Sequence, residues 1–200
     1  MRSNYCLLLF LLYFPITSAF AGNESLIVAG GCFWCVEADF EKLEGVTSAV
    51  SGYIGGSLAN PTYAQVASGK TGHFEGVIIN YDPGKISLRQ LVDHFWKTID
   101  PTDPNGQFCD KGSPYKTALF YRDEQQRQVF QQSLAEIDKS KPFEKPIVTQ
   151  ILPATEFYNA EDYHQDYYKK NPIRYNLYRT SCGRDSTIRK LWGEVVNNEL

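Results

Sequence analysis

Two cysteines three residues apart, Cys32 and Cys35, are the side chains of this chain best placed for covalent chemistry. They follow an apolar run at 26–29 and a glycine pair at 30–31, and an amphipathic run comes after them. This order predicts a strand, a glycine turn and a helix, with Cys32 in the first helical turn. Unpaired N–H groups and the helix dipole favour an anion there, so we expect Cys32 to tend toward the reactive thiolate. The sequence therefore predicts redox or nucleophilic sulfur chemistry.

A Cys-x-x-Cys pair also allows other chemistry. A zinc site would need two more ligands, and Cys109 and Cys182 are the candidates, although neither belongs to a second paired motif. A purely structural bridge is the third interpretation. A thioredoxin-like oxidoreductase remains an alternative, because that fold also places Cys-x-x-Cys between a strand and a helix. A non-catalytic binding domain held by disulfides is an alternative from another class of protein.

A carboxylate beside an aromatic residue is the second feature with chemical potential. Glu75 follows Phe74 and comes directly before an apolar run at 76–81 that predicts a buried strand. If Glu75 points into an apolar site, its pKa rises and it can serve as a general acid. Thiol–disulfide exchange does not require such an acid. The plain alternative is an exposed carboxylate at the end of a strand.

Several short motifs occur in order between about residue 26 and residue 172. They are Gly31–Trp34, Asn60–Tyr63, Thr71–Glu75, Tyr81–Pro83, Phe95–Trp96 with Asp100–Pro101, the segment around Tyr115, and Ala160–Gln165. Together they resemble the signature of the A-type peptide methionine sulfoxide reductases, and they cover most of the chain. The resemblance implies an enzyme that reduces the S epimer of methionine sulfoxide, free or in proteins, through a cysteine sulfenic acid.

The resemblance also implies roles for individual residues, in a site without metal or bound cofactor. Cys32 matches the nucleophile and Glu75 matches the acid that protonates the sulfoxide oxygen. The remaining matches are two tyrosines that hold that oxygen, an aspartate that orders the pocket, two aromatic residues that form an apolar wall around the substrate methyl group, and a supporting histidine: Tyr63, Tyr115, Asp110, Phe33, Trp34 and His73.

A second thiol must reduce the sulfenic acid before the next turnover. Many relatives have glycine at the position of Cys35 and place resolving cysteines near a glycine-rich C-terminus, which this chain lacks. We narrowly favour Cys182, because it lies late in the chain, followed by Cys35, which is local, and then Cys109, which adjoins Asp110. The resemblance implies a thioredoxin-like protein as the external electron donor.

The elements that must position these residues alternate irregularly between strand and helix patterns. Ser87 begins a helix with Gln90 in the capping-box position, and Asp123 caps another. The other predicted elements are a strand followed by a long loop within 45–72, strands at 76–81, 116–121 and 146–152, and helices at 161–168 and 185–196. Without strict strand–helix alternation, the class predicted is α+β. We expect a compact two-layer α/β sandwich of ferredoxin-like type with a mixed sheet and a long irregular C-terminal segment.

The N-terminus predicts a destination outside the cytoplasm. Arg2 precedes an almost wholly apolar stretch at 6–14, and Ala19-Phe20-Ala21 has the small-x-small form of a cleavage site. We therefore expect a secretory signal peptide at 1–21, a single domain at 22–200, and export to the periplasm. The formal net charge of −3 over 200 residues argues against a nucleic-acid partner. After cleavage we expect a monomer without a membrane anchor that repairs oxidised exported proteins.

Overall fold

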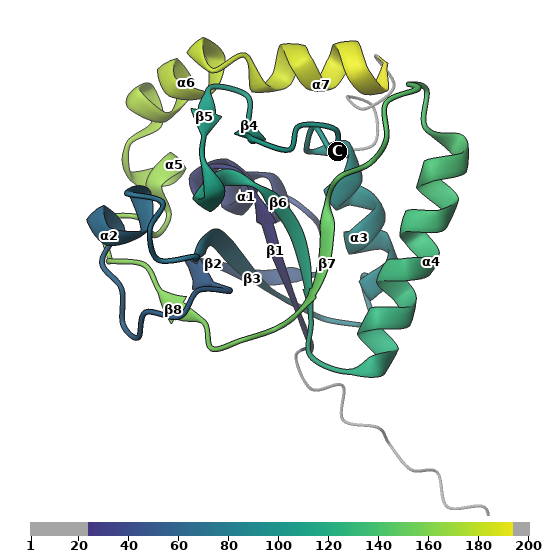
Figure 1. The fold of residues 1–200 in the computed structure, drawn as a ribbon, viewed down its shortest axis with the longest axis horizontal. Helices are drawn as coiled ribbons and strands as arrows, with labels where there is room; N and C mark the ends of the chain where they lie inside the picture. Colours follow the sequence, from purple (N-terminus) through teal and green to yellow (C-terminus); the bar gives the residue numbers. More distant parts are fainter. Residues whose placement is uncertain (1–23, 194–200) are drawn as a thin grey trace, which may run out of the picture.

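A six-stranded mixed sheet organises the protein, whose computed structural model describes residues 24–193 (Figure 1). The predicted signal peptide lies outside these residues. The strand order is β7-β6-β1-β3-β2-β8, and every neighbouring pair is antiparallel except β6 and β7. The strands are β1 (Glu24–Gly30), β2 (Val46–Ile54), β3 (Phe74–Tyr81), β6 (Thr117–Tyr121), β7 (Gln150–Pro153) and β8 (Tyr158–Asn159). The predicted α+β class and mixed sheet are confirmed.

Strand β1 is apolar on both sides because both faces of the sheet are covered. Leu26 and Val28 belong to the main core, whereas Ile27 and Ala29 belong to a smaller cluster on the opposite face. Successive side chains of a strand alternate between the two faces, so a continuous apolar run is what a strand buried on both sides requires. This burial fixes β1, and with it the turn that carries Cys32.

Three helices contact the sheet and bury the main core: α1 (Phe33–Phe40), α3 (Leu88–Lys97) and α4 (Glu124–Ser140). The capping box predicted for α3 is present, because Ser87 accepts from the Gln90 N–H and Gln90 accepts from the Ser87 N–H. The buried apolar residues of this helix are Leu91, Val92, Phe95 and Trp96. Asp123 caps α4 through the N–H of Gln126, as predicted.

Short elements occupy the connections around the Cys32 end of α1. They are α2 (Tyr63–Ala67), β4 (Gly106–Gln107), β5 (Asp110–Lys111) and the 3-10 turn η1 (Ser113–Tyr115). Strands β4 and β5 pair with each other as a separate two-stranded ribbon. These connections carry Tyr63, Asp110 and Tyr115, so three of the predicted site residues come from outside the main sheet.

The C-terminal segment contains three helices: α5 (Tyr167–Lys170), α6 (Pro172–Ser181) and α7 (Arg184–Trp192). It is therefore less irregular than predicted, although 161–166 forms turns where a helix was expected. Asp166 has a left-handed φ of 54°, which interrupts any helix that runs through it. Pro172 is the first residue of α6. An N–H at this position makes no hydrogen bond within the helix, so proline, which has no N–H, costs no such bond there.

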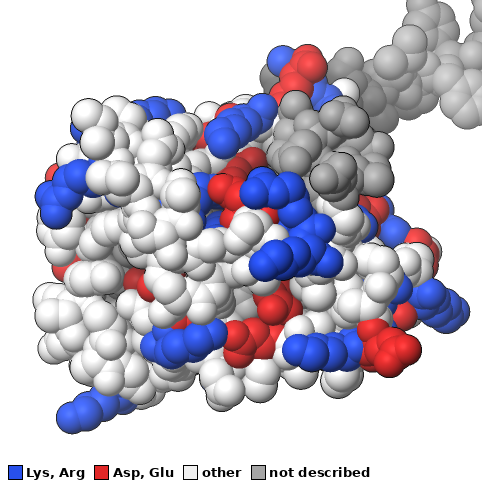
Figure 2. Space-filling view, turned by 90° about the horizontal axis from the view of Figure 1, so that it is seen from above, with Lys and Arg blue, Asp and Glu red and all other residues white. Residues whose placement is uncertain are grey.

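Buried hydrogen bonds attach this segment to the sheet and to α3. Arg184 donates to the carbonyl of Gly30 at 3.1 Å and to that of Thr98 at 2.8 Å, and Trp192 donates to Ile99 at 3.0 Å. Figure 2 shows basic and acidic side chains interspersed on the face seen from above, toward α6 and α7. Within residues 24–193, no helix is long and apolar enough to cross a bilayer.

Candidate active site

The turn from β1 to α1 places Cys32 as the N-cap residue of the helix. Gly31 has a φ of +83°, and a Cβ on it would lie 2.5 Å from the Cβ of Gln107. Gln107 cannot withdraw easily, because its amide group is hydrogen-bonded to both backbone groups of Asp100. Glycine is therefore required at this position both for backbone conformation and for space.

The electrostatics at Cys32 differ from the expectation for a helix start. The residue is 7% exposed, and burial raises the pKa of its thiol well above the ordinary value, with further increases from Cys35 and Glu75. The first N–H of the helix, that of Phe33, does not turn to the sulfur but donates to Glu75 Oε2 at 3.0 Å. The resting Cys32 is therefore a thiol and not the thiolate that its position alone predicts.

Glu75 lies in β3 opposite Tyr53 of β2 and is 2% exposed. Burial raises the pKa of its carboxyl group to about 8, although the hydrogen bond from the Phe33 N–H opposes this shift. A carboxyl group with such a pKa is mostly protonated at neutral pH. The structure thus excludes the exposed strand-end alternative and places a mostly protonated carboxyl group directly beside the backbone of Cys32 and Phe33.

Phe33 and Trp34 form an aromatic wall that other aromatic residues hold in place. The Trp34 ring stacks on Tyr167, with 3.8 Å between centroids, and its indole N–H donates to His164 Nδ1 at 3.0 Å. The Phe33 ring lies 4.9 Å from the His164 ring and 6.4 Å from that of Tyr63. Phe33 is almost fully buried, whereas Trp34 is partly exposed.

The hydroxyl groups of Tyr63 and Tyr115 meet, with Tyr115 donating to Tyr63. Burial raises the pKa of Tyr63 to about 12 and raises that of Tyr115 further, and the Glu75 charge adds to both shifts. Both phenols therefore remain protonated donors at any physiological pH. The backbone N–H of Tyr63 donates to Glu161 Oε1 at 2.9 Å. This hydrogen bond fixes the start of α2, which carries the Tyr63 hydroxyl.

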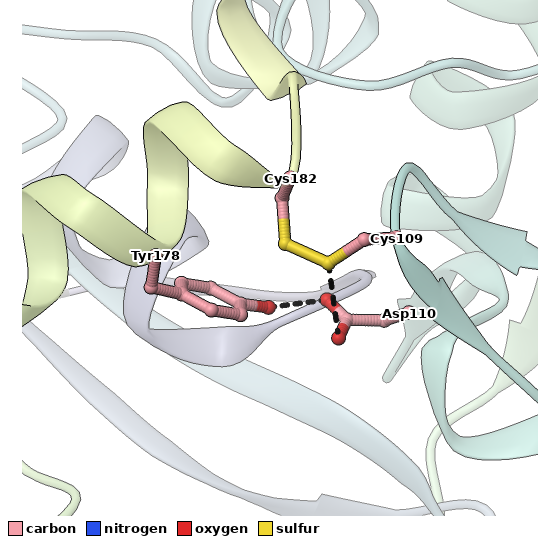
Figure 3. Close-up of a disulfide and its surroundings, with 4 residues drawn as sticks. All are labelled: Cys109, Asp110, Tyr178 and Cys182. Carbon is pink, nitrogen blue, oxygen red and sulfur yellow. Dashed lines mark hydrogen bonds between the residues drawn. A yellow bond between two sulfur atoms is a disulfide. The ribbon is translucent and has the colours of Figure 1, made fainter.

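Asp110 is linked to Cys32 through Tyr178, a residue that the sequence did not indicate. Figure 3 shows the Tyr178 hydroxyl pointing to the Asp110 carboxyl group. The Tyr178 hydroxyl donates to Asp110 Oδ2 and is also within hydrogen-bonding reach of the Cys32 sulfur. Burial raises the pKa of Asp110, which opposes ionisation of this carboxyl group. Tyr178 also packs edge-on against Trp34 at 5.8 Å.

A disulfide joins Cys109 to Cys182 beside this hydrogen bond (Figure 3). Cys109 adjoins Asp110 in the chain, and the N–H of Cys182 donates to the carbonyl of Tyr178 at 2.9 Å. The disulfide therefore crosslinks the two segments that supply Asp110 and Tyr178. In this state Cys182 and Cys109 offer no free thiol, so a resolving role for either requires that the disulfide be opened first.

Cys32 and Cys35 are free thiols and pack against each other in one buried cluster with Ala38 and Tyr175. The Cys32 thiol donates to the Cys35 sulfur, and this hydrogen bond is the largest of the influences that lower the pKa of Cys35. The guanidinium groups of Arg184 and Arg179 lower it further. Within the pair, negative charge therefore resides more easily on Cys35 than on Cys32.

The resemblance implies a supporting role for His73, and the structure shows which segment this residue contacts. Its Nδ1 accepts from the Gly56 N–H at 3.2 Å and its Nε2 contacts the Leu58 carbonyl at 2.8 Å. Both ring nitrogens are thus engaged by the loop that leads from β2 to α2. His73 supports the loop before Tyr63 and has no ring nitrogen left for substrate.

Two residues of the 160–165 motif contribute to the site in ways the sequence did not specify. His164 accepts from Trp34, and its Nε2 is buried without a partner among the described residues. Glu161 accepts from the Tyr53 hydroxyl at 2.7 Å as well as from the Tyr63 backbone. Both residues belong to the 160–165 motif, so the sequence indicated that this segment matters. It did not indicate which residues His164 and Glu161 contact.

The described residues contain two clusters with ligand atoms close enough for a metal ion. In the first, Cys109 and Cys182 flank Asp110, but their sulfurs are joined in the disulfide. In the second, Glu37 accepts from Ser51 and from a backbone N–H, while Lys169 pairs with both Glu41 and Asp166. Both clusters are therefore satisfied by protein groups.

Comparison with known proteins agrees with this geometry. A family model described as peptide methionine sulfoxide reductase matches residues 24–196. Peptide methionine sulfoxide reductase MsrA of Halalkalibacterium halodurans is 50% identical over 171 residues, which cover 86% of this chain and 97% of that protein. Peptide methionine sulfoxide reductase MsrA/MsrB of Vibrio cholerae is 47% identical over 182 residues, 91% of this chain. The chain spans only 48% of that relative.

Solved structures give the same result. The reduced form of Mxr1 from Saccharomyces cerevisiae matches with a TM-score of 0.72 and 31% identity, covering 77% of this chain and 88% of that one. Mxr1 in complex with Trx2 matches with a TM-score of 0.52 and 22% identity over 76% of this chain and 90% of that one, which shows the shared fold alone.

Proposed function

The chain belongs to the peptide methionine sulfoxide reductase family, and from this premise we propose that Cys32 is the nucleophile and Glu75 the general acid. The activity is that of a peptide-methionine (S)-S-oxide reductase. One observation carries the assignment of these roles. The N–H of Phe33, the residue that follows Cys32, donates to the buried carboxyl group of Glu75 at 3.0 Å, so thiol and acid adjoin one peptide group.

The reaction transfers one oxygen atom from the substrate to Cys32. The Cys32 sulfur forms a bond to the sulfoxide sulfur while the sulfoxide oxygen takes a proton from Glu75. The oxygen then bonds to the Cys32 sulfur. The substrate's sulfur–oxygen bond and the transient bond between the two sulfurs both break, which leaves an electron pair on the thioether. The thiol proton is returned to the carboxylate, so a thiol and a sulfoxide become a sulfenic acid and methionine.

The protonation states of Glu75 and Cys32 suit this step. Because the pKa of Glu75 is about 8, the acid form predominates at neutral pH. The raised pKa of Cys32 keeps its proton available until the sulfoxide is protonated. An uncharged thiol beside an uncharged acid also avoids the cost of burying two negative charges together.

The tyrosine hydroxyls supply hydrogen bonds to the sulfoxide oxygen. Oxygen carries growing negative charge until its proton arrives, and donors fixed beforehand stabilise that charge most effectively. Tyr63 and Tyr115 remain protonated, and their hydroxyls already meet. We assign them to this position, with Asp110 and Tyr178 ordering the groups beside Cys32.

The aromatic wall supplies the apolar contact for the substrate methyl group. Phe33 and Trp34 follow Cys32 directly, so the wall is positioned by the same helix start as the nucleophile. Stacking on Tyr167 and the hydrogen bond to His164 restrict Trp34 to one orientation. A methyl group gains favourable burial there, whereas a polar substituent would lose its hydration.

An external dithiol completes the cycle, and no resident cofactor is needed for it. A thioredoxin-like protein is the proposed donor, which is supported by the complex of yeast Mxr1 with Trx2. The donor dithiol becomes a disulfide as it returns two thiols to the enzyme.

Export is proposed from the sequence of residues 1–21, which has the form of a cleaved signal peptide. The mature enzyme at 22–200 is then a periplasmic monomer that repairs oxidised exported proteins. N-terminal sequencing of the protein from fractionated cells tests this: a periplasmic product starting at Gly22 supports it, and an uncut cytoplasmic product contradicts it.

An assay with separated epimers tests the catalytic assignment. With dithiothreitol as reductant, the enzyme converts methionine S-sulfoxide and leaves the R epimer. A Cys32→Ala variant abolishes turnover, while a Cys35→Ala variant retains the first turnover. Conversion of the S epimer by the Cys32→Ala variant would show that another residue is the nucleophile.

A further inference from the structure

We infer that Glu37 is a positioning residue for substrate binding, which sets the aromatic wall through Asp166 and Tyr167. Its carboxyl group holds the backbone that brings the Tyr167 ring onto Trp34. The inference rests on the proposed function, since it requires that Trp34 contact the substrate methyl group. Glu37 is assigned no contact with the substrate and acts only through other residues.

Glu37 is a buried acidic residue in the helix that also carries Trp34. It lies three residues after Trp34 in α1 and is 1% exposed. A carboxyl group at such a site requires hydrogen-bond partners for its oxygens. Its Oε2 accepts from the Ser51 hydroxyl of β2, and its Oε1 accepts from the backbone N–H of Asp166. Glu37 therefore joins α1 both to β2 and to the segment that leads into α5.

The hydrogen bond from the Asp166 N–H supports a backbone conformation that is unfavourable by itself. Asp166 has a φ of 54° and a ψ of 30°, in the left-handed region that a residue with a Cβ rarely adopts. It precedes Tyr167, the first residue of α5, and no side chain caps this four-residue helix. So short a helix does not hold its own start in place. Glu37 thus fixes the turn from which the Tyr167 side chain projects.

Gln165 fastens the same segment to β2 but does not replace Glu37. Its Oε1 accepts from the Ser51 N–H at 3.0 Å, and its Nε2 donates to the carbonyls of Ser51 at 2.9 Å and Ala160 at 2.8 Å. These bonds fix the chain before the left-handed turn. The N–H of the turn residue Asp166 itself is held by Glu37.

Two partners of Trp34 come from this one segment. The Tyr167 ring stacks on the Trp34 ring, with 3.8 Å between centroids and 8° between planes. His164, which accepts from the Trp34 indole N–H, lies two residues before Asp166. Trp34 is partly exposed, so these contacts and not complete burial select its orientation. A shift of the Asp166 backbone would therefore move the wall that receives the substrate methyl group.

The Asp166 N–H requires an acceptor oxygen and not a negative charge. Burial raises the pKa of Glu37 to about 7, so the acid and the carboxylate are both populated at neutral pH. In the acid form one oxygen still accepts from Asp166, while the O–H donates to the Ser51 hydroxyl oxygen. The amide of glutamine offers the same acceptor and donor. We therefore expect Glu37→Gln to keep the wall in place.

Steady-state kinetics with methionine S-sulfoxide and dithiothreitol test the inference. Glu37→Met keeps the length of the side chain but removes both acceptor oxygens. The methyl contact is made in the bound substrate and in the transition state alike, so KM should rise about tenfold while kcat stays within a factor of about three. Glu37→Gln should keep the wild-type KM. Glu41→Gln is the matched control, because the Glu41 carboxylate contacts only the side chains of Tyr168 and Lys169.

A double-mutant cycle separates this role from a merely structural one. Tyr167→Leu removes the stacking on Trp34 and should raise KM by itself. If Glu37 acts through Tyr167, the Glu37→Met/Tyr167→Leu variant has the KM of Tyr167→Leu alone. Loss of folded protein would instead lower the apparent kcat and leave KM unchanged. Should Glu37→Met not fold, Glu37→Asp takes its place, because its shorter side chain cannot reach Ser51 and Asp166 together.

Three results would overturn the inference. The first is a wild-type KM in Glu37→Met, or in Glu37→Asp where that variant replaces it. The second is a double variant in which the two increases in KM multiply. The third is a Glu37→Gln variant whose KM rises as much as that of Glu37→Met. Failure of the wild type to convert the S epimer would contradict the proposed function instead, so the two failures are distinguishable.

Discussion

Glu75→Gln separates the acidity of the site from its shape. Glutamine keeps an oxygen that accepts from the Phe33 N–H, so the hydrogen bond at 3.0 Å survives while the proton donor is lost. We expect the rate of methionine release in the first turnover to fall about 10²-fold or more at neutral pH. The measurement uses rapid quench without reductant, and Glu44→Gln, at an exposed position, serves as the matched control.

The pH dependence of this loss follows from the pKa of Glu75, which is about 8. A carboxyl group with a raised pKa is an acid below that value and loses its proton above it. Its protonated fraction falls from about nine-tenths at pH 7 to about one-tenth at pH 9. Burial is the largest cause of the raised Cys32 pKa and acts in both enzymes, so dividing the wild-type rate by the Glu75→Gln rate mainly isolates the titration of Glu75. This ratio should therefore fall about tenfold between pH 7 and pH 9.

Two results would refute the reasoning about Glu75. One is a ratio that stays constant across this pH range, because the carboxyl proton would then not be used. The other is a Glu75→Gln enzyme within a factor of about three of the wild type, because a lost general acid typically costs about 10²-fold or more.

Three further predictions follow from the site. Tyr63→Phe removes one hydrogen bond to the sulfoxide oxygen and should lower kcat about 10²-fold with little change in KM, as steady-state kinetics would show; an unchanged kcat would remove Tyr63 from the mechanism. Gly31→Ala places a Cβ 2.5 Å from the Cβ of Gln107, at a backbone φ of +83°. Each kcal/mol of this strain should lower the Tm of the protein by about 2–4 °C, which calorimetry measures. An unchanged Tm would show that the turn can relax. Opening the Cys109–Cys182 disulfide, which spans 73 residues, should destabilise the fold by about 4 kcal/mol in denaturant titrations, with Cys→Ser variants and reduced wild type agreeing; equal stability in both forms would contradict this.

Local patterns in the sequence account for the features that were predicted well. The apolar run of β1, the glycine pair and the capping box at Ser87 each depend on neighbouring residues, and each is present in the structure. In these cases the physical cause lies within a few residues of the feature. For Glu75 the local pattern allowed both a buried and an exposed carboxylate, and the structure shows the buried one.

Long-range contacts account for what the sequence did not show. Trp34 meets His164 across 130 positions, and Arg184 reaches Gly30 across 154. No local pattern indicates such partners, so the arginines around Cys35 and the role of Tyr178 emerged only from the fold. The motif around His73 indicated that this residue matters, but not what it contacts. In the structure its two ring nitrogens contact backbone groups of Gly56 and Leu58.

The state of Cys32 shows how a local rule can be overridden. A helix start favours a thiolate, but burial, Cys35 and Glu75 together raise its pKa. The first N–H of the helix is used by the carboxyl group of Glu75. Environment therefore decides the protonation of this thiol, and that environment is built from α1, β3 and α6.

The central claim is that one oxygen atom passes from the sulfoxide to Cys32. A single turnover with methionine S-sulfoxide labelled with ¹⁸O, performed on a Cys35→Ser variant and followed by mass spectrometry, tests this most directly. We expect one labelled oxygen on the peptide that contains Cys32 and one equivalent of methionine, with neither product from the R epimer. Methionine released without label on that peptide, or label on another cysteine, would contradict it.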